Sequence, residues 1–590
     1  MNAILERLSG LRGAMRTHGI SHYLVPSADE HINEYLPRWN ARREWLSGFS
    51  GSAGDLLVGI DPHETVLFTD GRYHLQAERQ LAGTSIALER VGTKDAKTLG
   101  QKISEFAKAH GAKFVLGFDP AVLAIGTVEA LEKLVQPHGA RLAPIPGHLV
   151  DALWHDRERP PTSPLIACPS EWSGASVAQK LDALRRQCAK HDATALTVVK
   201  LDQIAWLLNL RSLDDVPYNP VFEAFLYVDA TSVHVFVHGP DQRLSREARA
   251  SIPGLVTHEY AEFVPFLERV ANARVLLDPD ATTQSVLNAL TRSSSNTIVR
   301  SQIPIELAKA VKNEHELRCM ERANLLASFA KARALRWLDE RVAAGDHVTE
   351  ASFRDRIEAY YADLPGYRGL SFNTISATGK NGAIIHYGEA GEHPLRDGEL
   401  FLIDSGIQCD GGTTDATRTV AVGTPTAEQR RLFTRVLQAH IGGAKAVFPE
   451  GTSGAAIDAL VRAPMWSDGL NYDHGTGHGV GAFLCVHEGP FAIAEPKRRA
   501  NAVIALAPGM ITSIEPGYYR ADFGGIRIEN LYVVKDLNKV VDGKRYFGLE
   551  SLTWVPFDER LIDRAELTRA ELAWLDHYQA ESARRLATVG

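Results

Sequence analysis

The segment HGTGHGVGAFLCVHEGP, residues 474–490, places three histidines and five glycines in one short run. An imidazole can bind a metal ion or move a proton, and glycine lets the backbone approach a bound group closely. Because glycine disfavours helix, the segment is not a helical zinc motif of the HExxH type, and we predict a turn or a strand. We therefore expect the backbone and both histidines of HGTGH, His474 and His478, to lie close to a metal ion or a substrate, and His487 is a further candidate in the same run.

Two pairs of acidic residues lie at strand-like segments marked by glycine turns. Asp404 ends the apolar run FLIDSG, and Asp415 follows eleven positions later in GGTTDATRTV. Glu515 ends a strand-like run in TSIEPG, and Glu529 lies in GGIRIENLYVV, again after Gly-Gly. Strands joined by a glycine turn can bring two carboxylates to one face of a hairpin. In the alternating strand, Arg527 is expected to share the face of Glu529.

Four carboxylates that converge among apolar residues would repel one another, and burying each one unpaired would be very costly. A pair of divalent cations removes this conflict, and oxygen-rich ligands with one imidazole suit manganese, cobalt or zinc. For any one of these residues alone, a role in a turn, a cap or the core is more common. Their joint occurrence on glycine-marked turns favours a metal site. By contrast, packing or surface roles are expected for His31, His191, Trp206 and Cys485.

The elements that must position these residues begin with a faint internal repeat. The repeated residues are Leu8, Leu11, Arg12, His18, Val25 and Asp29, matched 173 positions later by Leu181, Leu184, Arg185, His191, Val198 and Asp202. Both copies are typical of a helix, an apolar strand and a turn that holds the Asp. A chance likeness between two amphipathic helices is the alternative. The register continues into the strand, which favours two similar α/β domains.

Composition along the chain indicates the domain boundaries. The segment RERPPTSPLIACPS, residues 157–170, contains four prolines and is typical of a linker. Within IPIELAKAVKNEHE, residues 303–316, strand-like patterning gives way to a long helix that continues to about Ala344. We therefore predict domains over residues 1–157, 158–303 and 304–590 in a protein of the α/β (α+β) class.

Composition and charge exclude several classes of protein. The chain has 590 residues, 45% of them hydrophobic, and a formal net charge of -8. No tract rich in Lys or Arg is present, which argues against nucleic acid and anionic membranes as partners. Five scattered cysteines fit a reducing compartment, and no apolar run approaches the roughly 18 residues of a membrane span. Since Glu6 interrupts the stretch where a signal peptide would be apolar, we expect a cytoplasmic protein.

These motifs together resemble a known family. DSG…TDATR, HGTGHGVG, VHEGP, SIEPGYY and GGIRIEN resemble the metallopeptidases with the pita-bread fold, which include aminopeptidase P, prolidase and methionine aminopeptidase. DEHINEYLPRWNARREWLSGFSGSAG, QIAWLLNLR and LTWVPFDERLIDRAELTRAELAWLDHYQ are similar to signatures of the cytosolic, three-domain type of aminopeptidase P, or Xaa-Pro aminopeptidase. The resemblance spans almost the whole chain. It implies two creatinase-like N-terminal α/β domains followed by a pita-bread catalytic domain with a C-terminal extension.

The resemblance also implies roles for individual residues. The implied metal ligands are Asp404 for one ion, His478 and Glu515 for the other, and Asp415 and Glu529 as bridges between the two. The implied substrate-side residues are His386 in AIIHYGE, His474, His487, Tyr387 and Arg527. Glu515 is also expected to accept the proton of the attacking water, and Arg527 to support a metal-binding carboxylate. Two divalent ions are implied, with manganese as the first expectation and cobalt or zinc as alternatives.

By the same resemblance, the chain is expected to be an enzyme that releases the N-terminal amino acid from peptides with proline in the second position. Such peptides would be its substrates, and a homodimer is expected. Prolidase is the nearest alternative, but it usually carries one N-terminal domain. Methionine aminopeptidase does not need so long an N-terminal half, and metal-free creatinase-type hydrolysis is disfavoured by the five ligands. A catalytically inactive pita-bread module that binds peptide or protein is the alternative from another class.

Overall fold

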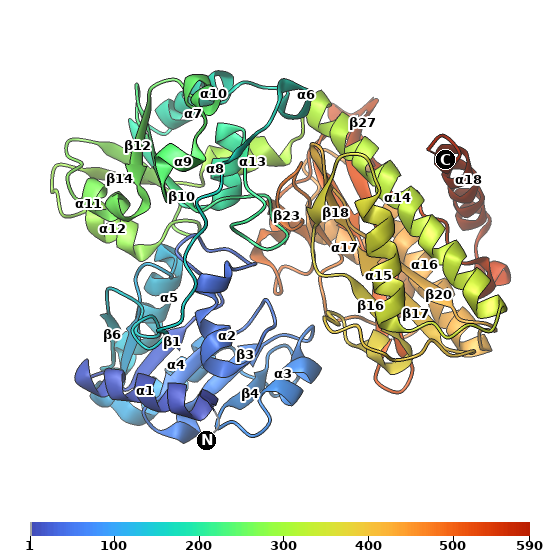
Figure 1. Cartoon of the computed structure of the whole chain (residues 1–590), viewed down its shortest axis with the longest axis horizontal. Helices are drawn as coiled ribbons and strands as arrows, with labels where there is room; N and C mark the ends of the chain where they lie inside the picture. Colours follow the sequence, from blue (N-terminus) through green and yellow to red (C-terminus); the bar gives the residue numbers. More distant parts are fainter. Residues whose placement is uncertain (1–2, 590) are drawn as a thin grey trace. The chain divides into compact units, whose positions relative to one another are not determined.

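The structure is a computed structural model that describes residues 3–589, and the chain divides into two compact units (Figure 1). The first unit comprises residues 3–167, 175–217 and 221–305. The second comprises residues 168–174, 218–220 and 306–589. Within this described part, none of the helices has both the length and the apolar character that crossing a membrane requires.

The first unit contains two six-stranded sheets of the same design, with the orders β4-β3-β2-β1-β5-β6 and β12-β11-β10-β8-β13-β14. The first sheet and its helices are β1 (His22–Val25), β2 (Asp55–Gly59), β3 (Val66–Thr69), β4 (Ala87–Arg90), β5 (Val115–Phe118), β6 (Arg141–Pro144), α1 (Ala3–Thr17), α2 (Arg42–Ser47), α3 (His74–Gln80), α4 (Leu99–His110) and α5 (Ile125–Val135). The second are β8 (Ala195–Val198), β10 (Ala224–Val228), β11 (Val233–Val237), β12 (Leu255–Glu259), β13 (Arg274–Leu277), β14 (Thr297–Arg300), α7 (Val177–Lys190), α8 (Leu201–Leu208), α9 (Pro240–Arg243), α10 (Arg246–Ser251), α11 (Phe263–Leu267) and α12 (Gln284–Leu290). A short pair, β7 (Ile166–Ala167) with β9 (Leu210–Arg211), completes the unit.

The predicted pair of similar α/β domains is confirmed by matching strand directions and by a matching side-chain contact. In both sheets the first strand pairs antiparallel with the second and parallel with the fifth. Nε of Arg12 on α1 donates to the carbonyl oxygen of Gly59 at the end of β2, at 3.0 Å. Nε of Arg185 on α7 donates to the carbonyl oxygen of Asp229, directly after β10, at 2.9 Å. Since β2 and β10 hold equivalent places, the two matched arginines hold equivalent chain segments.

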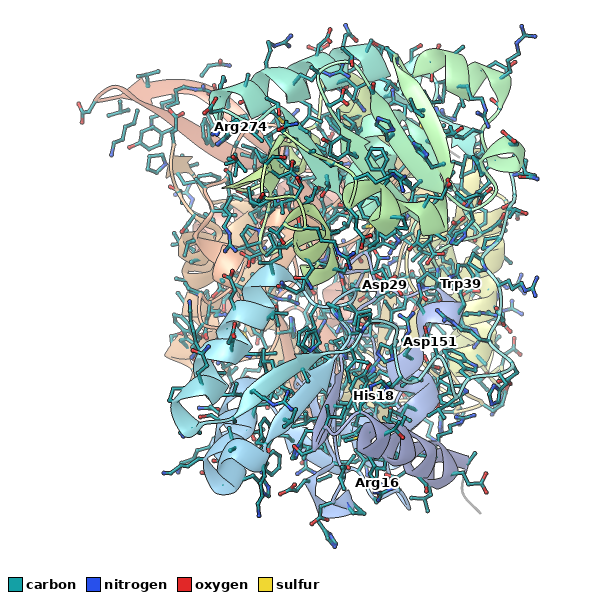
Figure 2. All side chains as sticks on the ribbon, turned by 90° about the vertical axis from the view of Figure 1, so that its left-hand side faces the viewer. Arg16, His18, Asp29, Trp39, Asp151 and Arg274 are labelled. Carbon is teal, nitrogen blue, oxygen red and sulfur yellow. The ribbon has the colours of Figure 1, made fainter. Side chains whose placement is uncertain are left out.

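The two aspartates of the repeat differ in their local structure. Asp29, labelled in Figure 2, lies in a turn and accepts hydrogen bonds from the backbone nitrogens of His31 at 3.0 Å and Asn33 at 3.2 Å. Asp202 lies in the first turn of α8, where the helix dipole favours a carboxylate. The prediction of a turn is therefore correct for the first copy and wrong for the second, because in the second copy only Val199 and Lys200 separate β8 from α8.

The second unit consists mainly of antiparallel strands and longer helices. Its sheets have the orders β16-β17-β20, β21-β28-β27-β24-β22-β23, β15-β18-β19 and β25-β26. The strands are β15 (Tyr367–Leu370), β16 (Ile375–Thr378), β17 (Leu400–Ser405), β18 (Ile407–Cys409), β19 (Gly412–Thr413), β20 (Ala416–Ala421), β21 (Phe448–Pro449), β22 (Gly477–Gly479), β23 (Glu488–Ile493), β24 (Ile511–Ile514), β25 (Gly517–Arg520), β26 (Gly524–Arg527), β27 (Asn530–Val541) and β28 (Lys544–Ser551). The helices are α6 (Ser170–Ser173), α13 (Pro304–Ala310), α14 (Glu314–Ala343), α15 (Glu350–Ala362), the 3-10 helix η6 (Gly379–Ala383), α16 (Ala427–Ala444), α17 (Gly454–Ser467) and α18 (Arg569–Leu586).

Two apolar clusters hold these sheets in place. α14 and α15 pack on β17, β18 and β20 through buried side chains that include Phe353 and Phe401. α16, α17 and α18 share a second cluster with β24, β26 and β27. α14 begins at a capping box formed by Asn313 and Glu316, and its 30 residues confirm the predicted long helix. Because the helices are buried along one face, they fix the strand ends on which the candidate site is built.

Candidate metal centre

The five candidate ligands come from two different sheets. Asp404 lies in β17, and Asp415 directly precedes β20, its neighbour in the three-stranded sheet. His478 is the middle residue of β22, Glu515 directly follows β24, and Glu529 directly precedes β27, all in the six-stranded sheet. Four of the five therefore lie at or next to a strand end.

The glycines beside His478 are explained by close approach between strands. β22 lies between β24 and β23 in the sheet. A Cβ atom at Gly477 would collide with the carbonyl oxygen of Ser513 on β24, and one at Gly479 with the carbonyl oxygen of Glu488 on β23. Of the two predicted possibilities, a turn or a strand, the structure shows a strand at His478. Glycine is needed there because two neighbouring backbones approach it closely.

His478 faces the carboxylates through one ring nitrogen. Its Nε2 is 3.5 Å from Oδ2 of Asp415 and 3.7 Å from Oε1 of Glu515. Ligand atoms of Asp415, His478 and Glu529 lie within 4.8 Å of one another. Nδ1 of His478 donates to the carbonyl oxygen of Gly479 at 2.9 Å, so the lone pair of the neutral ring is on Nε2. A histidine held in this tautomer is suited to bind a metal.

The electrostatics of the cluster favour a bound cation. Burial raises the pKa of Asp415 well above its ordinary value, and the charges of Asp404 and Glu515 raise it further. Burial also raises the pKa of Glu529, with added contributions from Asp415 and Asp404. Among residues 3–589, no group donates a hydrogen bond to Oδ1 of Asp404 or to Oδ1 of Asp415, although both atoms are buried. Divalent cations would supply the missing partners and remove the repulsion, so the residues fit a metal centre.

Arg527 supports two of the carboxylates. Its Nη2 donates to Oδ2 of Asp404 at 2.8 Å, and its Nε donates to the hydroxyl of Thr417 at 3.2 Å. Thr417 in turn donates to Oε2 of Glu529 at 2.8 Å. These contacts support the role expected for Arg527 as a partner of metal-binding carboxylates. The expected continuous strand is interrupted here, because β26 ends at Arg527 and β27 begins directly after Glu529.

His474 is hydrogen-bonded through both ring nitrogens. Nδ1 donates to the carbonyl oxygen of Gly475 at 2.7 Å, and Nε2 accepts from the hydroxyl of Tyr519 at 2.9 Å. Burial raises the pKa of Tyr519 to about 12, so this hydroxyl stays protonated at neutral pH. Nη2 of Arg462 donates to the carbonyl oxygen of His474 at 2.7 Å, and Asp458 holds Arg462 at 2.9 Å. Sequence reasoning did not single out Tyr519, although it lies in the motif SIEPGYY.

The two remaining histidines lie on different segments. The ring of His487 packs edge-on against His478, with centroids 4.4 Å apart. His386 is half-buried in the turn after η6. The next residue, Tyr387, is buried and donates its hydroxyl to Oε2 of Glu350 at 2.8 Å. Tyr387 therefore anchors the chain segment that carries His386.

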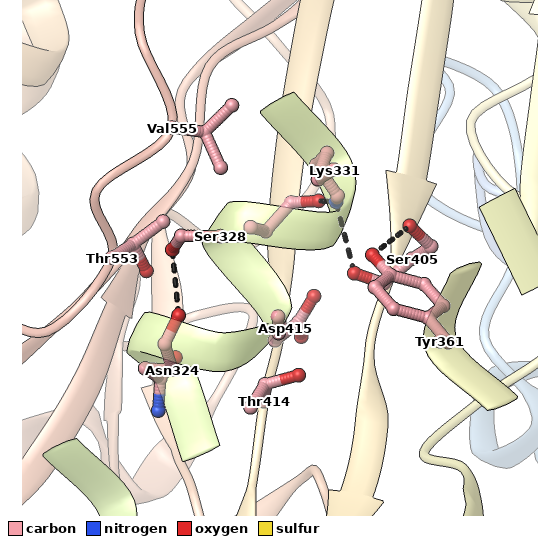
Figure 3. Close-up of a pocket in the computed structure, with 11 residues that line it drawn as sticks. Asn324, Ser328, Lys331, Tyr361, Ser405, Thr414, Asp415, Thr553 and Val555 are labelled. Atoms are coloured by element: carbon pink, nitrogen blue, oxygen red, sulfur yellow. Dashed lines mark hydrogen bonds between the residues drawn. The ribbon is translucent and has the colours of Figure 1, made fainter. Parts of the chain in front are cut away.

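A buried lysine, Lys331, lines the same pocket as Asp415 and was missed from the sequence (Figure 3). Lys331 of α14 donates to the carbonyl oxygen of Ser405 at 3.0 Å and to that of Ala416. Tyr361 of α15 hydrogen-bonds the hydroxyl of Ser405 at 2.9 Å. These residues and Asp415 line a small pocket. Burial lowers the pKa of Lys331 to about 8. No sequence motif marks Lys331, since a lysine at helical spacing is usually a surface residue.

The antiparallel sheets of the second unit and its carboxylate-rich centre are those of a metal-dependent hydrolase. Residues 318–536 match the model of metallopeptidase family M24, and residues 545–588 match the C-terminal region of these peptidases. Residues 7–153 and 156–316 each match a creatinase/prolidase N-terminal domain. These matches agree with the expected class of two creatinase-like α/β domains followed by a pita-bread domain.

Relatives and solved structures extend the likeness over the whole chain. A probable Xaa-Pro aminopeptidase P of Laccaria bicolor is 40% identical, over 98% of this chain and 89% of the relative. The crystal structure of X-prolyl aminopeptidase from Caenorhabditis elegans, described as a cytosolic enzyme with a di-nuclear active site, matches with a TM-score of 0.93. It is 33% identical, and the match covers 100% of this chain and 97% of that one. The chain belongs to the Xaa-Pro aminopeptidase P family within metallopeptidase family M24.

A smaller relative shares the fold alone. The Xaa-Pro dipeptidase from Bacillus anthracis matches with a TM-score of 0.52 at 22% identity. The match covers 99% of that chain but 65% of this one. About a third of the present chain therefore has no counterpart in the dipeptidase.

Proposed function

We propose that this chain is an Xaa-Pro aminopeptidase, which releases the N-terminal amino acid from peptides whose second residue is proline. The observation that carries the proposal is the cluster that Asp415, Glu515 and Glu529 form around the imidazole of His478, with the charge of Asp404 acting on Asp415 and Glu529. The likeness to the C. elegans X-prolyl aminopeptidase over the full length of the chain supports the same reaction.

The five residues would hold two divalent metal ions. In this proposal Asp404 would help to hold one ion, His478 and Glu515 would help to hold the other, and Asp415 and Glu529 would be shared between the two. Manganese is the first candidate because carboxylate oxygens dominate the site, and cobalt and zinc are the alternatives. When bound, the two cations would lower the pKa of a water molecule toward neutrality and polarise the carbonyl group of the first peptide bond.

Glu515 is the proposed proton acceptor. Its side chain is 19% exposed, compared with 11% for Asp404 and 6% for Asp415, so it can meet both water and substrate. It would take the proton of the attacking water and pass it to the leaving nitrogen. His474 in its present tautomer accepts from Tyr519 and would donate to the substrate only after taking up a second proton. We therefore assign the first contact with the substrate carbonyl to His386.

The preference for proline follows from the leaving group. A proline nitrogen has no N–H and lies in a ring, so the site needs a slot for the ring and no acceptor that requires that hydrogen. His386 and His487 are the proposed walls of this slot. Tyr387 would keep His386 in place through its hydrogen bond to Glu350.

Two alternatives make different demands on the structure. Prolidase shares the fold, but this chain carries two N-terminal α/β domains, and a third of it lies outside the match to the Bacillus dipeptidase. A binding module without catalysis would have no reason to keep five ligand-type residues at the five candidate positions. The aminopeptidase therefore accounts for more of the chain than either alternative.

The test is peptide cleavage followed by mass analysis, with metal-loaded protein and two substrates, a tripeptide of the X-Pro-Pro type and the dipeptide Gly-Pro. We expect the wild type to release the first residue from the tripeptide. In Asp415→Asn we expect this activity to fall more than roughly 100-fold, because losing a shared metal ligand should reduce activity more than losing a residue that only hydrogen-bonds a ligand. Asp410→Asn is the matched control, since Asp410 pairs with Arg368 at 2.7 Å outside the cluster. Cleavage of Gly-Pro alone would support prolidase, and equal activity in Asp415→Asn would contradict the metal assignment.

Location and assembly are also proposals. We place the enzyme in the cytoplasm, in keeping with the description of the C. elegans relative as cytosolic. We propose a homodimer, which sedimentation of the purified chain would test. The domain boundaries at residues 157 and 303 remain proposals that limited proteolysis can test.

A further inference from the structure

We propose that Lys331 is a positioning residue for the metal centre, because its ammonium group joins the two strands that carry Asp404 and Asp415. This inference rests on the proposed function for the identity of the ligands. The link between this buried lysine of α14 and the two strands consists of hydrogen bonds within the chain itself.

The contact lies at the end of the β17–β20 ladder. Ser405 and Ala416 form the last cross-strand pair of that ladder. Asp404 directly precedes Ser405, and Asp415 directly precedes Ala416. Nζ of Lys331 donates to the carbonyl oxygens of both members of the pair (Figure 3). One ammonium group therefore binds the backbone of the residue that directly follows each aspartate.

The surroundings of Lys331 give it a fixed position. Lys331 is 1% exposed, and its neighbours Ala330 and Ala334 are buried in the apolar cluster between α14, β17 and β20. Tyr361 approaches from α15 and hydrogen-bonds the hydroxyl of Ser405 at 2.9 Å. The lysine thus extends from a rigid helix to two strand ends, and a second helix holds one of these strand ends independently.

Charge and position predict opposite effects on metal affinity. The charges of Asp404, Asp415 and Glu529 act on Lys331 across the cluster. As a positive charge near two cations, Lys331 would weaken metal binding, so its removal would tighten binding if charge alone mattered. As a positioning residue it keeps the aspartate oxygens where the ions need them, so its removal would weaken binding. The sign of the change therefore distinguishes the two roles.

The experiment measures metal affinity directly, without substrate. Wild-type protein, Lys331→Met, Lys331→Arg and a control variant are stripped with a chelator and titrated with Mn²⁺ by calorimetry. Their melting temperatures are measured in the metal-free state. We expect the dissociation constant of Lys331→Met to rise about 10–100-fold. Lys331→Arg keeps the charge but carries it on a longer, planar group, and we expect it to bind several-fold more weakly than the wild type.

The matched control is a buried lysine of the other unit. Lys180 is 6% exposed, and its Nζ donates to the carbonyl oxygen of Trp206 at 2.8 Å and to Oδ1 of Asn209 at 2.7 Å. Lys180→Met is expected to lower the melting temperature and leave the Mn²⁺ affinity unchanged. An equal loss of affinity in this control would show that general destabilisation explains the result, and would overturn the proposal.

The outcomes separate this inference from the proposed function. Wild-type protein that binds no divalent metal would contradict the proposed function itself. Wild-type protein that binds two ions, beside a Lys331→Met variant that binds them equally well or more tightly, would overturn only the role of Lys331. If circular dichroism shows that Lys331→Met is unfolded, the Mn²⁺ affinity of Lys331→Arg becomes the test. A Lys331→Arg affinity equal to that of the wild type would overturn the positioning role of Lys331.

Discussion

The hydroxyl group of Tyr519 lies 2.9 Å from Nε2 of His474 and donates a hydrogen bond to that nitrogen. Arg527 donates to the same hydroxyl at 2.9 Å and to Asp404 at 2.8 Å. A chain of three hydrogen bonds therefore joins the glycine-rich histidine loop to a candidate metal ligand. It sets the tautomer of His474 and couples the orientation of the ring to the position of a carboxylate.

Tyr519→Phe tests this chain. Removing the hydroxyl deletes one hydrogen bond to Nε2 of His474 and one from Nη1 of Arg527, at a cost of about 1–3 kcal/mol. We expect kcat on an X-Pro-Pro peptide to fall about tenfold or more, with a shift in its pH profile. Tyr518→Phe is the control, because Tyr518 contacts Arg520 in the same hairpin at 3.4 Å. If Tyr519→Phe leaves kcat and its pH profile unchanged, this chain of hydrogen bonds has no role in catalysis.

Arg527→Lys tests the support of the carboxylates. A lysine cannot reproduce the fork that reaches Asp404, Tyr519 and Thr417 at once. We expect the Mn²⁺ dissociation constant to rise about 10–100-fold, as for other outer partners of metal ligands. Calorimetric titration of chelator-stripped protein measures it. Arg520→Lys, on the partly exposed neighbouring strand β25, should bind Mn²⁺ like the wild type. A normal affinity in Arg527→Lys would show that the carboxylates need no such support.

Tyr387→Phe tests the anchor of the His386 segment. The hydroxyl of Tyr387 donates to the buried carboxylate of Glu350, a type of hydrogen bond worth about 1.5–3 kcal/mol. Without it the His386 segment should hold substrate less firmly, so we expect KM to rise roughly threefold to tenfold, with a smaller change in kcat. Tyr360→Phe on α15 is the control. A lower kcat at unchanged KM would place Tyr387 in the chemical step instead.

The gain in stability from metal should depend on pH. Burial raises the pKa of Asp415 and Glu529 in the metal-free protein, from ordinary values of 3.8 and 4.5. A carboxyl with a raised pKa stabilises the folded state at pH below its ordinary value, and this contribution is lost as pH rises through the raised value. We therefore expect the difference in melting temperature between Mn²⁺-loaded and chelator-treated protein to grow from pH 5 to pH 8. A difference that shrinks over this range would contradict the raised pKa values.

Much of the architecture could be predicted from the sequence because it repeats or alternates locally. The 173-residue offset that relates Arg12 to Arg185 indicated two similar domains, and the two sheets have the same strand order. The glycines around His478 excluded a helix, which the strand β22 confirms. The turn predicted at Asp202 was wrong, because the pattern of an apolar strand followed by Asp also fits a strand that a helix follows after only two residues.

The candidate site could be predicted only as far as its motifs extend. The carboxylates and histidines lie in short glycine-marked segments, and the structure brings Asp415, His478 and Glu529 together. Lys331 and Glu350 lie on the separate helices α14 and α15, where spacing alone does not indicate which side chain is buried against a distant strand. Only the tertiary packing of those helices places them beside the site.

The candidate centre draws ligands from two different sheets, which meet where the backbone nitrogen of Glu529 donates to the carbonyl oxygen of Thr417 at 3.2 Å. Asp404 and Asp415 belong to the three-stranded sheet, and His478, Glu515 and Glu529 to the six-stranded one. Two metal ions held by ligands from both sheets would cross-link the two sheets of the catalytic unit, much as a disulfide joins two loops. Chelation would then speed amide hydrogen exchange in β20 and β24 together, and it would open a route for proteolysis far from either terminus.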